Sequence, residues 1–236
     1  MNYGIIAAGD GSRLAQEGVS LPKPLVRIDG QPMIGRLIDL FVGCRAESIS
    51  VIVNEYMTEV ADYLRSLRQT LPVPLNLVIK STPSSMHSFY ELGSLLRDKG
   101  RFVLTTVDTI FRRDDFARYV DTFAASPATV EGMMAVTGHV DDEKPLYVAT
   151  DSDMTITGFL DTPTPDVKYI SGGIYGLDSR AVDVLQRCID SGVHRMRNFQ
   201  RALVAEGLKL KAYDMGTILD VDHADDIRKA EKFIKG

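Results

Sequence analysis

Short apolar runs alternate with segments of helical periodicity along most of the 236-residue chain. Residues 3–8 form an apolar run that contains two β-branched residues and stops at glycine, a pattern typical of a buried strand. Residues 32–42 instead place apolar side chains three and four positions apart, as one buried helix face requires. Similar patterns predict strands at residues 50–53, 75–79, 101–107, 132–136 and 208–213, and helices at residues 57–68, 114–125, 180–189, 198–206 and 225–234. Strands that alternate with helices predict an α/β fold, with a mixed, mainly parallel sheet flanked by helices.

The pattern changes between residues 146 and 159. Residues 146–149 and 155–159 are short runs, and the segment Asp151-Ser152-Asp153 between them has the composition of a turn. We interpret these residues as a hairpin inserted into the same domain, because 236 residues suit one sizeable α/β domain better than two.

Composition and charge narrow the classes of function. Hydrophobic residues make up 44% and charged residues 25% of the chain, as in ordinary globular proteins. The formal net charge of −5 gives no general attraction to nucleic acid or to an anionic membrane, so an anion must bind at a local focus of positive charge. Cys44 and Cys188 lack a metal-binding spacing, and reduced thiols fit a cytoplasmic protein. Because no signal segment or membrane-length apolar run is recognised, we expect neither export nor membrane insertion.

The loop after the first predicted strand has the composition of a phosphate-binding site. Gly9 and Gly11 let the backbone approach a ligand closely, and successive backbone N–H groups in such a loop point into one concavity. Ser12 adds a hydroxyl group, and Arg13 adds a planar charged donor. Further along, two prolines hold Lys23 on a stiff segment. These features predict an anionic ligand, and the two cations favour a triphosphate.

Glycine loops also occur as simple tight turns, so the flanking residues matter. The dinucleotide-binding pattern would need a third glycine where this chain has Leu14, and the Gly-Lys-Ser/Thr of a P-loop is absent. The segment AGDGSRL, followed by PKPL, resembles instead the two-part signature of the nucleotidyltransferases that make activated sugars and alcohols, the sugar-nucleotide pyrophosphorylases and related cytidylyltransferases. The resemblance extends over the whole chain and implies a Rossmann-like domain of the nucleotide-diphospho-sugar transferase type.

The resemblance also implies roles for individual residues. Arg13 and Lys23 take the places of the family's catalytic cations, which hold the leaving pyrophosphate and contact the other phosphate groups. The segment SSMHSFYEL (84–92) resembles the family's base-binding Asn-Thr-x-x-Ser-Leu-Tyr without its Asn, and Ser85 is predicted to be a helix N-cap. A capped helix with no ligand is the alternative for this segment. The residues expected to bind the nucleotide are Ala7, Ala8, Gly9, Asp10, Gly11, Ser12, Ser85 and Ser88.

Two acidic segments are candidates for a metal site. Asp108 follows the predicted strand 101–107, and open α/β sheets bind ligands beyond the carboxyl ends of their strands. Carboxylates suit Mg²⁺, which takes one or two of them together with substrate phosphates, although an aspartate here could also simply form a turn. Residues 216–227 resemble the family's terminal acidic motif, which implies Asp220 first and Asp222 second as metal ligands, unless Asp222 caps the last helix. The expected cofactor is Mg²⁺.

A later segment is the candidate for acceptor binding. Residues 169–175, YISGGIY, resemble the strand that lines the family's acceptor pocket. Adjacent glycines in a strand are costly unless something must come close, so Gly172 and Gly173 are candidate acceptor-binding residues. The family's Glu-Lys-Pro segment, whose lysine meets the acceptor phosphate, is replaced by Asp161-Thr162-Pro163. Lys168 or Lys144 is the candidate substitute for that lysine.

Together these features predict a Mg²⁺-dependent enzyme that transfers a nucleoside monophosphate from a triphosphate to a phosphorylated acceptor and releases pyrophosphate. The acceptor would be a sugar 1-phosphate or a phosphoalcohol such as phosphocholine. We expect the nucleotide to bind within about residues 1–130 and the acceptor within about residues 131–215, with the metal motif and closing helix at residues 216–236. A glycosyltransferase of the related nucleotide-sugar fold and a catalytically silent nucleotide-binding subunit are the alternatives. The base, the acceptor and any homo-oligomer stay open.

Overall fold

The parallel strands at the centre of the sheet determine where a ligand can bind. In the computed structural model, which describes residues 1–141 and 143–236, β1 (Asn2–Ala7) lies between β4 (Ser48–Val53) and β6 (Phe102–Thr106) and is parallel to both. β5 (Leu75–Ile79) extends this parallel part beyond β4. The chain leaves β1 toward β4 and later returns to β6 on the other side. The sheet therefore has a switch point between β1 and β6, the place where open α/β sheets bind ligands.

The second half of the chain adds antiparallel strands. β11 (Tyr169–Leu177) is antiparallel to β6, to β8 (Gly132–Thr137) and to β9 (Tyr147–Thr150). β9 and β10 (Ile156–Leu160) form the predicted hairpin, and β12 (Leu210–Asp214) is parallel to β8. The mixed α/β sheet predicted from the sequence is confirmed, with its parallel strands gathered around β1.

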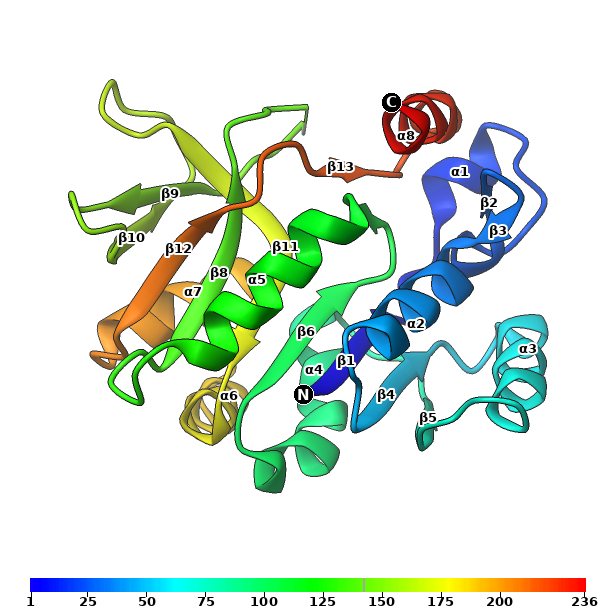
Figure 1. Cartoon of the computed structure of the whole chain (residues 1–236), viewed down its shortest axis with the longest axis horizontal. Coiled ribbons are helices and arrows are strands. Elements are labelled where there is room, and N and C mark those ends of the chain that lie inside the picture. The colour runs from blue at the N-terminus through cyan, green and yellow to red at the C-terminus, as the bar shows by residue number, and fades with distance from the viewer. Residues whose placement is uncertain (142) are drawn as a thin grey trace.

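Helices cover both faces of the sheet (Figure 1). One core contains side chains from α2 (Met33–Gly43), α3 (Thr58–Arg68) and α5 (Arg113–Ala125). The other contains side chains from α4 (Ser85–Leu96), α6 (Ser179–Asp190) and α7 (Met196–Ala205). β1 contributes to both cores, because Ile5 packs on one face of the sheet and Ile6 on the other. Burial on both faces explains why β1 is a continuous apolar run.

Short elements complete the fold. β2 (Arg27–Ile28) and β3 (Gln31–Pro32) form a small ribbon around the Asp29-Gly30 turn. A second ribbon pairs β7 (Thr109–Ile110) with β13 (Leu219–Asp220), and it joins the segment after β6 to the segment before α8 (Ala224–Lys235). Two-residue strands leave no periodic signal, so the sequence did not predict this second ribbon.

The predicted strands and helices are all present, with ends that differ by one or two residues. The 3₁₀ turns Lys23–Leu25 and Arg97–Lys99 and the short helix α1 (Ser12–Gln16) were not predicted, since each is too brief to show periodicity. A bilayer-spanning helix is not found in the part of the chain that the structure describes.

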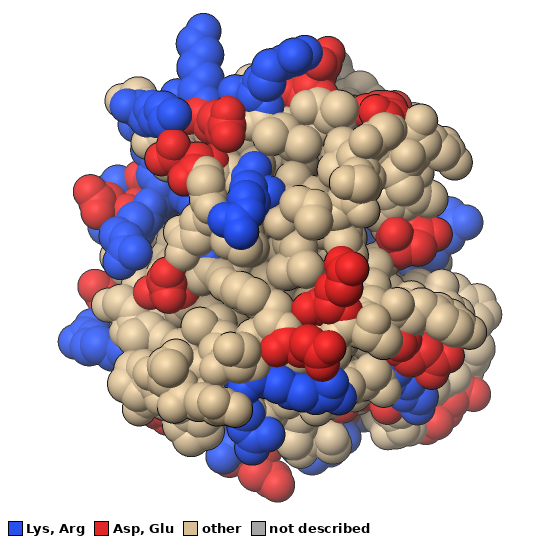
Figure 2. Space-filling view, turned by 90° about the vertical axis from the view of Figure 1, so that its right-hand side faces the viewer, with Lys and Arg blue, Asp and Glu red and all other residues tan. Residues whose placement is uncertain are grey.

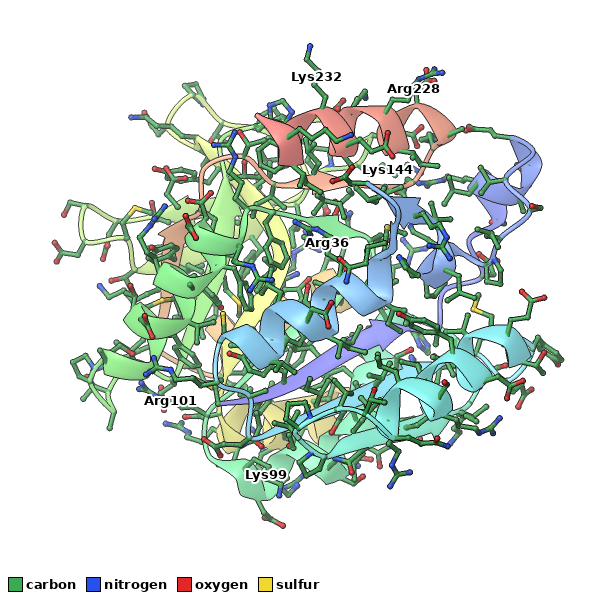
Figure 3. The ribbon with its side chains drawn as sticks, turned by 45° about the vertical axis from the view of Figure 1, so that its right-hand side comes forward. Arg36, Lys99, Arg101, Lys144, Arg228 and Lys232 are labelled. Atoms are coloured by element: carbon green, nitrogen blue, oxygen red, sulfur yellow. The ribbon has the colours of Figure 1, made fainter. Side chains whose placement is uncertain are left out.

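The surface around α8 is of mixed charge. On the face that carries α1, α3 and α8, positive and negative side chains are interspersed with uncharged ones (Figure 2). Arg228 and Lys232 extend from the outer side of α8 away from the body of the molecule (Figure 3).

The two glycines of β11 pack against the protein itself. Gly173 has a φ of +71°, and a Cβ there would lie 2.8 Å from Thr109 Oγ1. A Cβ on Gly172 would lie 2.3 Å from Ile218 Cδ1. What comes close to the strand here is the ribbon of β7 and β13, together with Ile218, which directly precedes β13.

Replacing Gly173 with alanine should therefore destabilise the fold. Because alanine at positive φ is strained and its Cβ would crowd Thr109, we expect the free energy of unfolding to fall by about 1–3 kcal/mol. Urea unfolding measures this change, and Gly158→Ala in β10 is the matched control, since no atom lies within 4 Å of its Cβ position. Equal stability of the two variants would contradict the packing role of Gly173.

Candidate nucleotide-binding site

A cavity of about 550 Å³ opens at the switch point of the sheet. We call it the β1–β6 cavity, because its floor includes Ile6 of β1 and Thr106 of β6. Its lining comes from four loops that follow strands of the sheet and from the segment before α8: Ala8, Gly9, Asp10, Gly11, Ser12, Arg13, Lys23, Asn54, Thr82, Pro83, Ser84, Ser85, Ser88, Val107, Asp108 and Asp222. The predicted glycine loop and the predicted acidic residues therefore meet at one place.

The glycine loop approaches the Lys23 side chain closely at Gly11. Gly11 has a φ of +64°, and a Cβ there would lie 2.9 Å from Lys23 Cβ. Gly9 has no atom within 4 Å of its Cβ position, so its backbone faces open space. The side chain of Asp10 accepts a hydrogen bond from Ser12 N at 3.2 Å and holds the turn. Glycine is thus required at position 11 by a close approach within the protein, while Gly9 leaves room for a ligand.

Lys23 lies between two carboxylates at the floor of the cavity. Its Nζ is 2.6 Å from Asp108 Oδ2 and 2.6 Å from Asp222 Oδ1. The Lys23 side chain is 10% exposed. Burial alone would lower its pKa, but the two carboxylates outweigh burial and raise the pKa above its ordinary value. Lys23 is therefore a permanent cation that joins residues from distant parts of the chain.

The same contact keeps Asp108 ionised. Burial would raise the pKa of Asp108, but the attraction of Lys23 and its hydrogen bond are stronger, and the net shift of the pKa is downward. Asp108 follows β6, and its carbonyl oxygen accepts a hydrogen bond from Val221 N at 3.1 Å. The β7–β13 ribbon thus holds the C-terminal acidic segment against Asp108.

Arg13 stands at the mouth of the cavity. Its Nη1 is 2.8 Å from Asp222 Oδ2, and its Nη2 is 3.8 Å from Glu143 Oε2. The side chain is 50% exposed, in contrast to the buried Lys23. The cavity therefore offers one fixed cation at its floor and one accessible cation at its rim, as a polyphosphate requires.

The two terminal aspartates differ in position. Val221 is buried between them, so Asp220 and Asp222 project on the side away from the core. Asp222 lines the β1–β6 cavity, whereas Asp220 does not. Asp220 lies near Tyr175, whose pKa is raised mainly by burial and further by this carboxylate. Geometry thus favours Asp222 over Asp220 as the partner of Asp108.

Asp222 is held in place by the start of α8. His223 is the N-cap residue of that helix, and its N donates to Asp226 Oδ2 at 2.9 Å in a capping box. Glu17, just after α1, accepts hydrogen bonds from Ala224 N at 2.6 Å and contacts His223 Nδ1 at 2.6 Å. The suggestion that Asp222 caps the helix is wrong, because His223 and Asp226 do so. These contacts leave the Asp222 carboxylate free for Lys23 and Arg13.

The remaining wall of the cavity is neutral and polar. Ser88 is 2% exposed, and its hydroxyl lies 2.6 Å from Thr82 Oγ1. Ser85 also lines the cavity, but the predicted N-cap is wrong by one residue, because α4 begins at Ser85 and Ser84 is its N-cap. Ser84 Oγ contacts His87 Nδ1 at 2.9 Å and makes no capping bond, since the ring competes for it. Small hydroxyl-bearing residues suit a flat base with polar edges.

Asn54 is a lining residue that the sequence analysis did not single out. Its Oδ1 accepts hydrogen bonds from Tyr56 N at 3.0 Å and from Ser81 Oγ at 2.9 Å, which ties the loop after β4 to the segment after β5. The signal was available, because Asn54 directly follows a parallel strand and Asp108 lies two residues after the end of another.

Five of the predicted site residues lie outside the β1–β6 cavity. Ala7 is a buried residue of β1, and Lys168 is exposed just before β11. Gly172 and Gly173 are packed inside β11, as described above, and Asp220 lies toward Tyr175. The structure thus gathers the predicted phosphate-binding residues and separates them from the predicted acceptor residues.

The residues present fit a magnesium ion. The carboxylates of Asp108 and Asp222 offer oxygen ligands for a cation, and both already contact the ammonium group of Lys23. No cluster of three or more His, Cys, Asp or Glu side chains suited to a metal occurs among residues 1–141 and 143–236. Two carboxylates without further protein ligands suit Mg²⁺, which usually completes its coordination with substrate phosphates and water.

Fold and site together define an α/β protein with a glycine-rich loop and a carboxylate pair at the switch point of its sheet. The family model described as nucleotidyl transferase matches residues 4–235. The chain therefore belongs to the nucleotidyl transferase family.

Individual curated relatives match this chain over a short segment or at low identity. The 2-aminoethylphosphonate cytidylyltransferase of Lancefieldella rimae is 43% identical over 60 residues, which cover 25% of this chain and 24% of that protein. The bifunctional protein GlmU of Alkaliphilus metalliredigens is 23% identical over 238 residues, which cover 92% of this chain and 47% of that protein. The matched region thus spans half or less of these curated relatives.

Solved structures share the fold over nearly the full length. The inositol-1-phosphate CTP transferase from T. maritima superposes with a TM-score of 0.79 at 17% identity and covers 99% of this chain and 97% of that one. A UDP-glucose pyrophosphorylase from Acinetobacter baumanii gives 0.80 at 17% identity, with coverage of 98% and 91%. At this identity the likeness supports the fold.

Proposed function

We propose that this protein transfers a nucleoside monophosphate from a nucleoside triphosphate to a phosphorylated acceptor and releases pyrophosphate. The observation that carries the proposal is the contact of Lys23 with both Asp108 and Asp222 beneath the glycine loop. Family membership and the fold shared with sugar-phosphate nucleotidyltransferases support it.

The chemistry needs positioning and charge, and no protein nucleophile. An acceptor phosphate oxygen forms a bond to the α-phosphorus, while the bond from that phosphorus to the bridging oxygen of the β-phosphate breaks. Both the attacking and the departing groups are anionic, so no proton has to be removed by the protein. Lys23 at the floor and Arg13 at the rim stabilise negative charge on the transferred and departing groups.

Asp108 and Asp222 are the residues that would hold Mg²⁺, and Asp220 is the weaker candidate. The ion supplies Lewis-acid charge to the triphosphate when bound. The chain's own residues hold both carboxylates next to Lys23 before substrate arrives. The backbone of Gly9 and Gly11, with Ser12, lies along the phosphates, while Ser85, Ser88 and Asn54 face the nucleoside.

A screen for pyrophosphate release tests the proposal. The protein, Mg²⁺ and each nucleoside triphosphate are combined with sugar 1-phosphates and alcohol phosphates, and pyrophosphate is measured by a coupled assay. We expect release that requires both one triphosphate and an acceptor. Nucleoside diphosphate released from a nucleotide sugar would indicate the glycosyltransferase alternative, and triphosphate binding without any product would indicate a silent nucleotide-binding protein.

A further inference from the structure

A second cavity adjoins the β1–β6 cavity on the side of α7. It has a volume of about 1150 Å³ and is lined by segments within residues 143–147, 161–163 and 192–205; we call it the α7 cavity. Arg13, which lines the first cavity, reaches Glu143 of the second at 3.8 Å. Ser84 of the first contacts His87, whose ring stacks on His194 of the second with centroids 5.4 Å apart. The two cavities therefore share a rim.

The α7 cavity carries more positive than negative side chains. Asp161 is contacted by two guanidinium groups, Arg197 at 2.7 Å and Arg201 at 2.8 Å. The hydrogen bonds from Arg201 and Arg197 lower the pKa of Asp161, so the carboxylate is ionised, but it balances only one of the two arginines. Glu143, the other acid in the lining, lies within ion-pair distance of Arg13 and His223.

Arg195 adds a further cation in an unusual backbone conformation. It directly precedes α7, lines the cavity and has a φ of +74°, which residues that carry a side chain rarely adopt. Within residues 1–141 and 143–236, no carboxylate lies within ion-pair distance of its guanidinium group. The Arg195 side chain is exposed at the wall of the cavity, so an anion that enters the cavity can reach it.

We propose that the α7 cavity binds the acceptor and that this acceptor carries a second anionic group, a carboxylate or a phosphate, besides the phosphate that reacts. This inference rests on the proposed function, since the reacting phosphate must reach the β1–β6 cavity across the shared rim. Arg195 presents a planar donor group that matches such an anion. Arg197 and Arg201 already donate to Asp161 and to backbone carbonyl oxygens, so they contribute positive charge to the cavity. An acceptor with a cationic tail, such as phosphocholine or ethanolamine phosphate, would instead face uncompensated positive charge.

The test compares acceptors that differ in one charged group. Glucose 1-phosphate is paired with glucuronate 1-phosphate, and glycerol 3-phosphate with 3-phosphoglycerate; ethanolamine phosphate represents a cationic tail. Pyrophosphate release is measured with Mg²⁺ and the preferred triphosphate. We expect kcat/KM to be about tenfold higher or more for the anionic member of each pair that reacts, since a charge-assisted hydrogen bond discriminates by that factor.

Matched variants test whether the preference for anionic acceptors depends on the α7 cavity or on the overall charge of the protein. Arg195→Gln should abolish the preference for the anionic member, and Arg195→Lys should keep part of it. Arg228→Gln on the outer side of α8 removes the same charge at an exposed position and should leave the preference unchanged (Figure 3). A preference that survives Arg195→Gln would overturn the assignment of this cavity.

Other outcomes distinguish a failure of the anionic-acceptor inference from a failure of the proposed function. Equal or higher kcat/KM for the neutral or cationic members would overturn the anionic acceptor and leave the proposed function standing. Silence with all acceptors would contradict the proposed function, and calorimetry with 3-phosphoglycerate and glucuronate 1-phosphate then tests the cavity alone. Binding that Arg195→Gln weakens about tenfold would support the inference, whereas absent binding, or binding that this variant leaves unchanged, would overturn it.

Discussion

Replacing Lys23 with alanine is expected to lower the rate of pyrophosphate release about a thousandfold, because a preorganised charge at the reacting phosphates is lost. The substitution also leaves Asp108 and Asp222 facing each other without the ammonium group that lies 2.6 Å from each. Two adjacent carboxylates without a counter-ion repel each other and attract a cation more strongly, so we expect the lower rate to be accompanied by a lower Mg²⁺ requirement. The measurement is kcat and KM for the triphosphate across a magnesium titration.

Two variants make the Lys23 result specific. Lys23→Arg keeps the charge but cannot place a point charge between the two carboxylates, so it should recover only part of the rate. Lys80→Ala removes a lysine that pairs with Glu91 outside the β1–β6 cavity, and its rate should stay within about twofold of the wild type. Thermal unfolding followed by circular dichroism checks that each variant is folded. A Lys23→Ala protein that is folded and nearly as active as the wild type would show that Lys23 takes no part in the reaction.

Replacing Asp108 with asparagine is expected to lower the rate about a hundredfold or more, because a neutral amide cannot provide the charge that a magnesium ion requires. Asp222→Asn should have an effect of similar size, since the two carboxylates share Lys23. Asp220→Asn should have a much smaller effect, because Asp220 does not line the cavity. The measurement is the dependence of kcat/KM on Mg²⁺ concentration for all three variants.

Asp225→Asn provides the matched control. Asp225 belongs to the same acidic segment, but it is exposed and pairs with Arg228 on α8. Its activity and magnesium requirement should equal those of the wild type. The opposite result would be an Asp220→Asn variant as impaired as Asp108→Asn and an Asp222→Asn variant that keeps its activity. Asp220 would then be the metal ligand, as the resemblance of the terminal motif implies.

The sequence by itself determined the fold class and most of the residues that line the β1–β6 cavity. Both depend on local patterns: β1 is apolar from Tyr3 onward because both of its faces are buried, and Gly9, Gly11 and Asp108 lie in the loops that follow strands. In a sheet with parallel central strands, the residues after those strands lie at one edge whatever the details of packing. The family was indicated by the resemblance of the segments AGDGSRL and PKPL to a known signature, which is also a local feature of the sequence.

Only the tertiary structure decided which charges meet. Lys23 is 85 residues from Asp108 and 199 residues from Asp222, and nothing local to any of them reports that separation in space. The choice of Asp222 over Asp220 depends on the β7–β13 ribbon and on the anchoring of α8 by Glu17. The cationic α7 cavity likewise assembles residues from three segments of the chain. Periodicity reveals which face of an element is buried, whereas long-range packing alone determines which side chains share a cavity.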